Sequence, residues 1–287
     1  MKSQIINIDV TDWKVNNPDY DWVAALESGK VLHFTNLPFD ISETEKKLLS
    51  PLILKKNSRN ISLSATNLLK GAECDEHLLD ALTNLMTRFR QNATTLITSL
   101  APNYKLEISP TSFRPIQVED RKQSYRANDK LLHIDAFPTR PNYGKRILRV
   151  FININPDNIP RVWRIGEPFE KVANTFLHKV KPYSFWQASL LNKFKITKSL
   201  RSEYDHIMLQ LHDIMKLDSI YQSDAEQIKV PFYSGSVWVC FSDQASHSVM
   251  SGQYMMEQTF NLPLSSLYDS DSSPLAVLNR ITNKQLI

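Results

Sequence analysis

Two long parts of the chain repeat their apolar residues at helical spacing. Residues 76–100 read EHLLDALTNLMTRFRQNATTLITSL, which predicts a long amphipathic helix that ends before Pro102. A second helical region extends over about residues 167–217, and SEYDHIMLQLHDIM is its clearest piece. Ser42 followed by Glu45 has the spacing of a capping box, so we expect a short helix to begin there.

The other apolar stretches have the composition of strands. GKVLHFTNLPF, residues 29–39, predicts a short strand that enters a turn, and KLEISPTSFRPIQVE alternates and is rich in β-branched residues. RILRVFININ is a continuous apolar run, as expected for a strand that is covered on both faces. RVWRIG, QIKVPF, SVWVCFSD and HSVMSGQYMMEQTFNLPL predict further strands. Helices first, and then strands around a helical insertion, predict an α+β fold with a β-sandwich or jelly-roll core.

Composition agrees with one folded domain over residues 1–287. The chain is 42% hydrophobic with only six glycines, which excludes a disordered or repetitive protein. We expect a mainly helical part at about 1–105 and a jelly-roll core at about 106–287, with a helical insertion at about 167–220.

Several features lead us to expect a cytoplasmic protein. No apolar stretch is long enough for a membrane span, and the start MKSQIINIDVTDW has no apolar secretory signal. Cys74 and Cys240 lie far apart, and we expect both to be reduced thiols.

Charge is distributed unevenly along the chain. The net charge is only +4, but residues 121–200 contain sixteen Lys/Arg against five Asp/Glu. An excess of one sign favours an anionic partner. A basic surface that is merely solvated is the open alternative.

The stretch LLHIDAFPTRPNYGKRILRVFININP, residues 131–156, contains the candidate chemistry. His133 and Asp135 are two positions apart, so on a strand their side chains lie on one face and can chelate one ion. His247 lies between two late strands, and a jelly roll would bring it to face the pair. Two imidazoles and one carboxylate leave positions open on Fe(II) for a bidentate co-substrate and O₂. Mg²⁺ and Ca²⁺ prefer oxygen ligands, and a structural Zn²⁺ would close its fourth position.

The remaining histidines are weaker candidates for the third ligand. His33 lies in the early strand and His77 at a helix start. For His178, His206 and His212, which lie in the helical insertion, we expect surface or packing roles.

Arg149 interrupts the apolar run RILRVFININ, where it shares one strand face with Phe151 and Asn153. A buried guanidinium needs an anion, and its planar fork suits a carboxylate. That anion is either an internal Asp or Glu or the distal carboxylate of 2-oxoglutarate. No Lys or Arg occurs between His247 and Leu278, so the strand after the late histidine offers no basic anchor. We therefore choose Arg149 as the anchor.

Other side chains near these motifs are further candidates. Arg114, Arg146, Arg161 and Arg164 are cations that suit a carboxylate or a phosphate. Trp163 either forms a wall of the co-substrate pocket or belongs to the core.

Three segments together carry a family resemblance: LLHIDAFPTRPNYGKRILRVFININP, PRVWRIGEPFE and SGSVWVCFSDQASHSVMSGQYMMEQTF. With them the chain resembles the Kdo hydroxylase family. These are Fe(II)/2-oxoglutarate-dependent dioxygenases of Gram-negative bacteria that hydroxylate C3 of 3-deoxy-D-manno-oct-2-ulosonic acid (Kdo) in the lipopolysaccharide inner core. The resemblance extends from about residue 29 to the ending SPLAVLNRITNKQL.

The resemblance implies a double-stranded β-helix core and a cytoplasmic enzyme on the inner face of the inner membrane. It implies Kdo-lipid A as substrate, with Fe(II), 2-oxoglutarate and O₂ as cofactor and co-substrates. The iron ligands would be His133, Asp135 and His247.

Around the iron, the resemblance implies that Arg149, with Arg114 and Trp163, borders the 2-oxoglutarate site. We add Asn153 because it shares the strand face of Arg149. Candidates for the anionic head of the substrate are the basic residues of the positive segment: Arg121, Lys122, Arg126, Arg140, Lys145 and Arg146.

The segment FWQASLLNKFKITKSLR mixes aromatic residues with cations and suits an anionic membrane surface, although an ordinary exposed helix is equally open. We expect no nucleic-acid partner, and self-association is left open.

Three other functions are not excluded by the residues. The same iron chemistry on another anionic substrate is one, and a non-catalytic jelly-roll module for anionic glycans is the second. The third is a zinc hydrolase, which needs a general base that these motifs do not identify.

Overall fold

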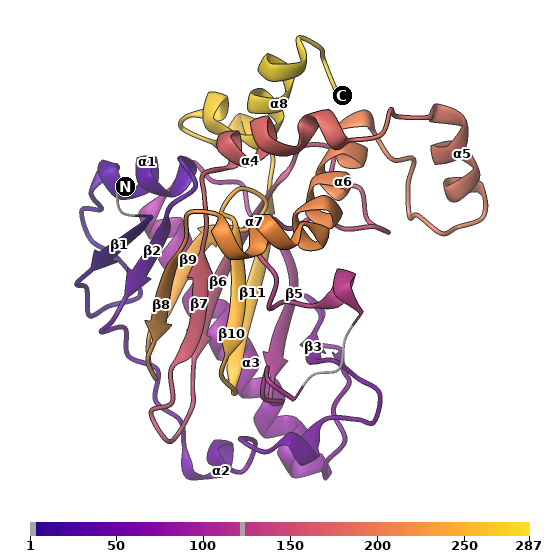
Figure 1. Ribbon diagram of the computed structural model, residues 1–287. Coiled ribbons are helices and arrows are strands. Elements are labelled where there is room, and N and C mark those ends of the chain that lie inside the picture. The colour runs from indigo at the N-terminus through magenta and orange to yellow at the C-terminus, as the bar shows by residue number, and fades with distance from the viewer. Residues whose placement is uncertain (1–3, 121–123) are drawn as a thin grey trace.

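The computed structural model describes residues 4–120 and 124–287, which form two β-sheets flanked by helices (Figure 1). In this part of the chain the larger sheet has eight strands in the order β1-β2-β9-β6-β11-β5-β3-β4, and the smaller has the order β10-β7-β8. The strands are β1 Ile5–Ile8, β2 Val31–Phe34, β3 Ile61–Leu63, β4 Leu69–Lys70, β5 Glu107–Arg114, β6 Arg146–Asn153, β7 Arg161–Ile165, β8 Ile228–Phe232, β9 Val237–Phe241, β10 His247–Ser251 and β11 Met255–Leu262.

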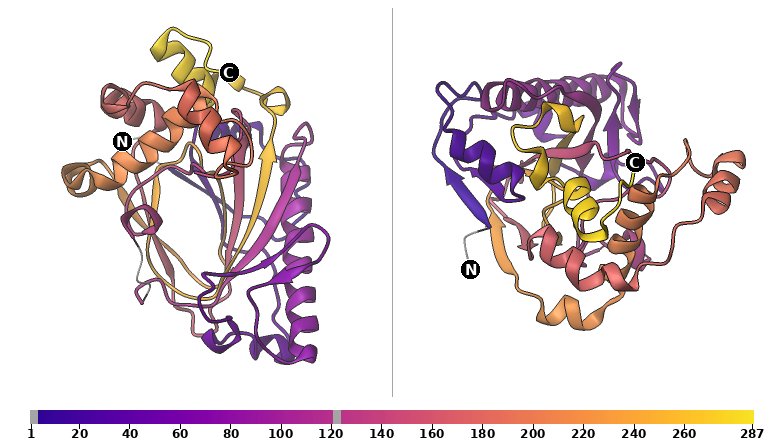
Figure 2. Two further views of the ribbon diagram at one scale, coloured as in Figure 1. Left: turned by 90° about the vertical axis from the view of Figure 1, so that its right-hand side faces the viewer. Right: turned by 90° about the horizontal axis from the view of Figure 1, so that it is seen from above.

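Most of the α-helices cover the outer face of the larger sheet or one end of both sheets, and α2 lies at the other end (Figures 1 and 2). They are α1 Tyr20–Glu27, α2 Glu43–Lys46, α3 Glu76–Leu100, α4 Phe169–Phe176, α5 Phe185–Lys193, α6 Glu203–Leu217, α7 Ser219–Asp224 and α8 Pro274–Thr282. The predicted helical insertion is therefore four helices, and α5 projects away from the others (Figure 1).

Local signals located the ends of the first helices correctly. The long helix α3 begins and ends where its apolar period predicted, and the side chain of Asp75 accepts a hydrogen bond from the Leu78 N–H at its N-terminus. The capping box at α2 is confirmed, since Ser42 Oγ accepts from the Glu45 N–H and Glu45 Oε2 from the Ser42 N–H. Both caps satisfy backbone donors that would otherwise have no partner.

The first part of the chain contributes more to the sheet than its helical pattern indicated. Strands β1 and β2 extend one end of the larger sheet, and β3 and β4 extend the other. Strand β2 lies in the stretch 29–39 that was predicted as a strand, whereas β1, β3 and β4 have two to four residues each, too few to show an alternating pattern.

The central strands β6 and β11 are covered on both faces, as the continuous apolar run RILRVFININ predicted for β6. Along β11, Met256 and Phe260 belong to the main core that includes α3, whereas Met255 faces the smaller sheet. Glu257 follows on the same face as Met255 because strand side chains alternate. The inner face of the larger sheet therefore mixes apolar and charged residues.

Aromatic side chains fill one end of the space between the two sheets. Trp238 of β9 stacks on Phe151 and on Phe232, with ring centroids 5.2 and 4.2 Å apart, and Trp163 of β7 meets Trp238 edge-on at 5.5 Å. These packed rings fix the spacing of the sheets next to the site described below.

Two further predictions concern sulfur and membrane spans. Cys74 and Cys240 are both free thiols, as expected, and Cys240 is buried in β9. Among the residues that the structure describes, none of the helices is both long and apolar enough to cross a bilayer.

Candidate metal centre and ligand cavity

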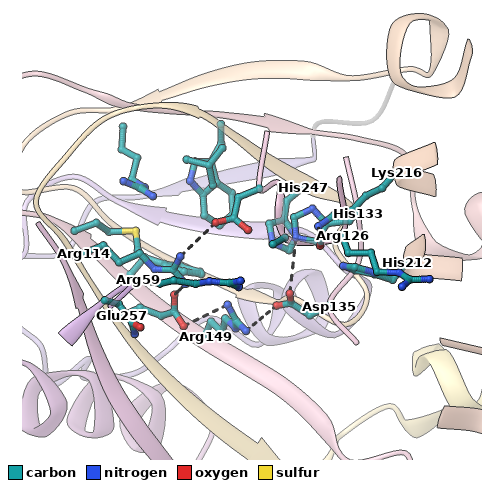
Figure 3. Close-up of a pocket in the computed structure, with 18 of the residues that line it drawn as sticks. Arg59, Arg114, Arg126, His133, Asp135, Arg149, His212, Lys216, His247 and Glu257 are labelled. Carbon is teal, nitrogen blue, oxygen red and sulfur yellow. Dashed lines mark hydrogen bonds and ion pairs between the residues drawn. The ribbon is translucent and has the colours of Figure 1, made fainter. Parts of the chain in front are cut away.

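The structure brings His133, Asp135 and His247 together beside the smaller sheet (Figure 3). His247 is the first residue of β10, and His133 pairs with it in an isolated antiparallel bridge, with N–H to carbonyl distances of 3.0 and 2.9 Å. The Asp135 N–H donates to the carbonyl of Ser242 at 2.8 Å, which holds the segment after the bridge. One ligand atom from each residue lies within 4.8 Å of the other two.

Backbone carbonyls orient both imidazoles. Nδ1 of His133 donates to the Leu131 carbonyl at 2.7 Å, and Nδ1 of His247 donates to the Ala245 carbonyl at 2.8 Å. Because a carbonyl only accepts, each Nδ1 carries the proton and leaves the Nε2 lone pair for a metal. Burial lowers the pKa of both histidines, so both rings are neutral at pH 7.

Asp135 is an ionised carboxylate with a cation at its back. Burial alone would raise its pKa, but Arg149 and the two imidazoles hold the pKa of Asp135 well below its usual value. Nη2 of Arg149 lies 3.0 Å from Oδ2 of Asp135, whereas Oδ1 lies 3.9 Å from Nε2 of His133. One carboxylate oxygen therefore faces the histidines and the other faces the guanidinium.

This donor set fits a mononuclear non-haem Fe(II) site. Two neutral imidazoles and one carboxylate are its usual protein ligands, and they leave coordination positions open. Within residues 4–120 and 124–287, no other group of three His, Cys, Asp or Glu side chains meets in this way.

The three residues line a cavity of about 310 Å³ between the two sheets. Its charged lining residues are six cations and three carboxylates: Arg59, Arg114, Arg126, Arg149, Arg161 and Lys216 with Asp129, Asp135 and Glu257. A net positive wall in a confined space favours anionic ligands.

Buried and partly buried charges of alternating sign extend from the metal ligands into this cavity. Arg149 Nη1 lies 3.3 Å from Glu257 Oε1, and Arg114 Nη2 lies 3.1 Å from Glu257 Oε2. Arg114 also lies 3.4 Å from Asp129. Burial opposes the charge of Glu257, yet Arg149 and Arg114 hold its pKa below the usual value. The sequence left open whether an internal carboxylate is the partner of Arg149. The structure shows two such partners, Asp135 and Glu257.

Trp163 is both a core residue and a cavity wall. It is almost fully buried in the aromatic cluster, and its indole stacks on the His247 ring at 5.0 Å and 19°. The plane of the His247 ring is therefore held both by this stacking and by the Nδ1 hydrogen bond to Ala245.

Two of the predicted ligand contacts are wrong. Asn153 is buried outside the cavity, where its amide donates to the carbonyls of Ile159 and Phe232 and holds a turn. Arg146 is fully buried as well, with Nε 2.8 Å from Asp243 Oδ2. Neither side chain lines the cavity. Arg146 is three residues before Arg149 and therefore points to the opposite face of β6. Asn153 shares the face of Arg149 but lies four residues farther along the strand, beyond the cavity.

The other predicted substrate residues are spread over two sites. Arg126 lines the metal cavity and pairs with Asp213 at 2.9 Å. Arg140 and Lys145 line a second groove of about 770 Å³, where Lys145 pairs with Glu107 at 2.7 Å. Arg121 and Lys122 lie outside the described residues.

The second groove adjoins the metal cavity. Asn60, Phe137 and Glu257 line both. A large ligand bound over the metal ligands can therefore extend along the second groove toward Arg140.

Sequence reasoning missed the contribution of helix α6 to the cavity. His212, for which a surface or packing role was expected, lines the cavity, with its ring 5.5 Å from that of His133. Lys216 lies one turn later and lines the cavity too. Their i,i+4 spacing was visible, but no local signal indicated which face of the helix covers the metal ligands. Arg59, from the loop before β3, was also missed, because no local pattern predicts that a loop residue will line a distant cavity.

Two imidazoles and a carboxylate at a cationic cavity between two sheets are typical of the non-haem Fe(II) oxygenases. Residues 9–285 match the family described as 3-deoxy-D-manno-oct-2-ulosonic acid (Kdo) hydroxylase. The chain belongs to the Kdo hydroxylase family, as the resemblance of its motifs predicted.

Solved structures of the Kdo hydroxylase KdoO, a non-heme Fe(II) α-ketoglutarate-dependent dioxygenase, are similar over the whole chain. Its complex with cobalt(II) has a TM-score of 0.95 and 40% identity, covering 99% of this chain and 98% of that one. Its complex with α-ketoglutarate and Fe(III) has a TM-score of 0.94 and 41% identity, covering 99% and 97%. Its complex with succinate and Fe(III) has a TM-score of 0.94 and 40% identity, covering 99% and 98%. A search of curated proteins found no match.

Proposed function

We propose that this protein hydroxylates C3 of Kdo on Kdo-lipid A, with Fe(II) as cofactor and 2-oxoglutarate and O₂ as co-substrates. The observation that carries the proposal is the meeting of His133, Asp135 and His247 at a cationic cavity. Membership of the Kdo hydroxylase family supports the substrate.

The iron ligands would be Nε2 of His133, Nε2 of His247 and a carboxylate oxygen of Asp135. Fe(II) bound there supplies oxygen activation, in which 2-oxoglutarate becomes succinate and CO₂ and one oxygen atom enters a substrate C–H bond. The protein holds both rings by their Nδ1 hydrogen bonds and holds Asp135 through Arg149. The two sheets and α6 form the walls of the cavity in which the substrate would meet the metal.

The direct test combines a spectrum with a product analysis. Adding Fe(II) and 2-oxoglutarate without O₂ should produce a weak visible charge-transfer band. Admitting O₂ with Kdo-lipid A should then add one oxygen to Kdo and form one succinate per product. Hydroxylation of a different acidic sugar would indicate the same chemistry on another substrate. A glycan-binding module would form no succinate, and a zinc hydrolase would act without O₂.

For the co-substrate, we propose that Arg149, with Arg114 and Trp163, borders the 2-oxoglutarate site. Arg149 and Arg114 place two guanidinium groups on the cavity wall formed by the larger sheet. Their shared partner Glu257 leaves each with further N–H donors for a carboxylate.

Replacing Arg149 with alanine should raise the Kd for 2-oxoglutarate about 10- to 100-fold, the loss expected for a charge-assisted hydrogen bond. Anaerobic titration of the charge-transfer band measures this Kd, and metal analysis shows whether Fe(II) is still bound. An unchanged Kd would limit Arg149 to holding Asp135.

The fold that suits this function is a double-stranded β-helix in one domain over residues 1–287. The order of the strands supports it, because β5, β6, β9 and β11 lie in the larger sheet while the His133 segment, β7, β8 and β10 lie opposite. Among the predicted substrate residues, Arg126 at the cavity and Arg140 and Lys145 in the adjoining groove stay as proposed contacts to anionic groups of the glycolipid.

We further propose that α5 rests on the anionic cytoplasmic face of the inner membrane. Phe185, Trp186, Phe194 and Ile196 are each more than half exposed at this projecting helix and the turn after it (Figures 1 and 2). Lys193, Lys195 and Lys198 lie among them. Large apolar side chains beside lysines suit the boundary of an anionic bilayer.

Changing Phe185 and Trp186 together to serine should weaken binding to vesicles that contain anionic phospholipid, measured by co-sedimentation. Leu52→Ser is the matched control. Leu52 is also a large apolar residue that is mostly exposed, at 87%, but it lies in the N-terminal part of the chain and not at α5. Equal loss in the two variants, or equal binding to neutral vesicles, would contradict the membrane contact.

A further inference from the structure

Lys216 is a buried cation that faces the metal cavity. Its residue is only 5% exposed, and Nζ donates to the Arg126 carbonyl at 2.8 Å. Among residues 4–120 and 124–287, no carboxylate lies within ion-pair distance of Nζ. Burial lowers the pKa of Lys216, whereas the more distant Asp129, Asp135 and Asp213 raise it. A buried ammonium is costly unless an anion compensates it, so a ligand is the expected partner.

Lys216 extends from helix α6 into the cavity that the metal ligands line. In the view of Figure 3, Lys216 and His212 lie on one side of His133, and Arg149 and Glu257 lie on the other. The guanidinium on the sheet side already has carboxylate partners, whereas Lys216 contacts a neutral carbonyl. The cavity therefore has two cationic walls. The charge of Arg149 on one wall is already compensated by carboxylates, whereas that of Lys216 on the other is not.

We propose that Lys216 binds the carboxylate of the acidic sugar and so positions the carbon that is oxidised. This inference rests on the proposed function. In a 3-deoxy-2-ulosonic acid the carboxylate is C1 and the reacting carbon is C3, only two bonds away. An ammonium that holds the carboxylate beside His133 therefore limits where C3 lies relative to the metal ligands. 2-Oxoglutarate is assigned to the opposite wall, where Arg149 and Arg114 lie.

The experiment measures binding, so that it does not depend on turnover. The protein is loaded with Co(II) and 2-oxoglutarate without O₂ and titrated calorimetrically with the methyl glycoside of Kdo and with the methyl ester of that glycoside. Wild type should bind the acid about 10- to 100-fold more tightly than the ester, as expected for a charge-assisted hydrogen bond. Lys216→Met should remove this preference by weakening only the acid, and Lys216→Arg should restore part of it.

Lys229→Met is the matched control, because Lys229 is an exposed lysine on edge strand β8 of the smaller sheet. It should keep the full preference for the acid. Thermal unfolding checks that each variant is folded. If Lys216→Met does not fold, Lys216→Arg still tests the proposal.

Equal weakening of acid and ester by Lys216→Met would overturn the proposal, because Lys216 would then only shape the wall. A lower affinity for 2-oxoglutarate, with the preference for the acid intact, would overturn it as well and would assign the anion to the co-substrate. Failure of the proposed function has a different signature: wild type would prefer the acid but would leave Kdo-lipid A unoxidised in the presence of Fe(II) and O₂.

Discussion

Replacing His133 or His247 with alanine should abolish Fe(II) binding and bring turnover below detection, while the protein stays folded. Each imidazole gives its Nδ1 proton to a backbone carbonyl and keeps Nε2 for the metal. Removing one ring leaves two protein ligands, which hold Fe(II) too weakly for a site that must also bind a co-substrate. The fold loses one hydrogen bond and some packing, which is a moderate cost.

Metal analysis and thermal unfolding measure this result together. Fe(II) should raise the melting temperature of the wild type, since it binds only the folded state, and should not raise that of either variant. His178→Ala is the matched control, because His178 is an exposed histidine in the helical insertion. Full iron content and activity in His247→Ala would place the metal elsewhere.

Asp135→Ala should lose the metal as well, but at a larger cost in stability. This carboxylate also faces the buried guanidinium of Arg149 at 3.0 Å. In the metal-free protein, the difference in the free energy of unfolding between Asp135→Ala and His247→Ala therefore measures what the ion pair of Asp135 with Arg149 contributes to stability.

Glu257→Ala should lower the free energy of unfolding of the metal-free protein by about 3–5 kcal/mol, the cost of breaking a buried ion pair. Glu257 is buried and lies between two guanidinium groups, 3.3 Å from Arg149 and 3.1 Å from Arg114. Without it, two cations lie next to each other on the same wall of the cavity with no carboxylate between them. Urea unfolding measures the change.

The matched control for this variant is Glu107→Ala. Glu107 also pairs with a cation, Lys145, but the two side chains are 53% and 42% exposed. Exposed pairs contribute about 0–1 kcal/mol, so this variant should be nearly neutral. A loss below about 1 kcal/mol in both variants would mean that water, and not Glu257, compensates the two arginines.

Local patterns were sufficient for much of the fold. The apolar period of residues 76–100 and the Ser42–Glu45 spacing act over a few residues, so α3 and the α2 cap match the prediction. The strands β6, β7, β9 and β11 were also visible, because their side chains are buried in the way that their composition indicates.

The partners of individual polar side chains were not predictable in the same way. Arg146, Arg149 and Asn153 lie on one strand, yet the first pairs with Asp243, the second lines the cavity and the third holds a turn. Position along a strand determines these differences only after the neighbouring strand and its register are known.

By itself the sequence determined which residues have metal-ligand chemistry, since His133 and Asp135 are two positions apart and His247 follows near two late strands. It also determined an excess of cations near them. The tertiary structure decided which side chains meet in the cavity. The bridge between His133 and His247, the position of Glu257 between two arginines and the face that α6 turns to the metal ligands join residues far apart in the chain. Contacts of this kind depend on how whole elements pack, and local sequence patterns do not encode that packing.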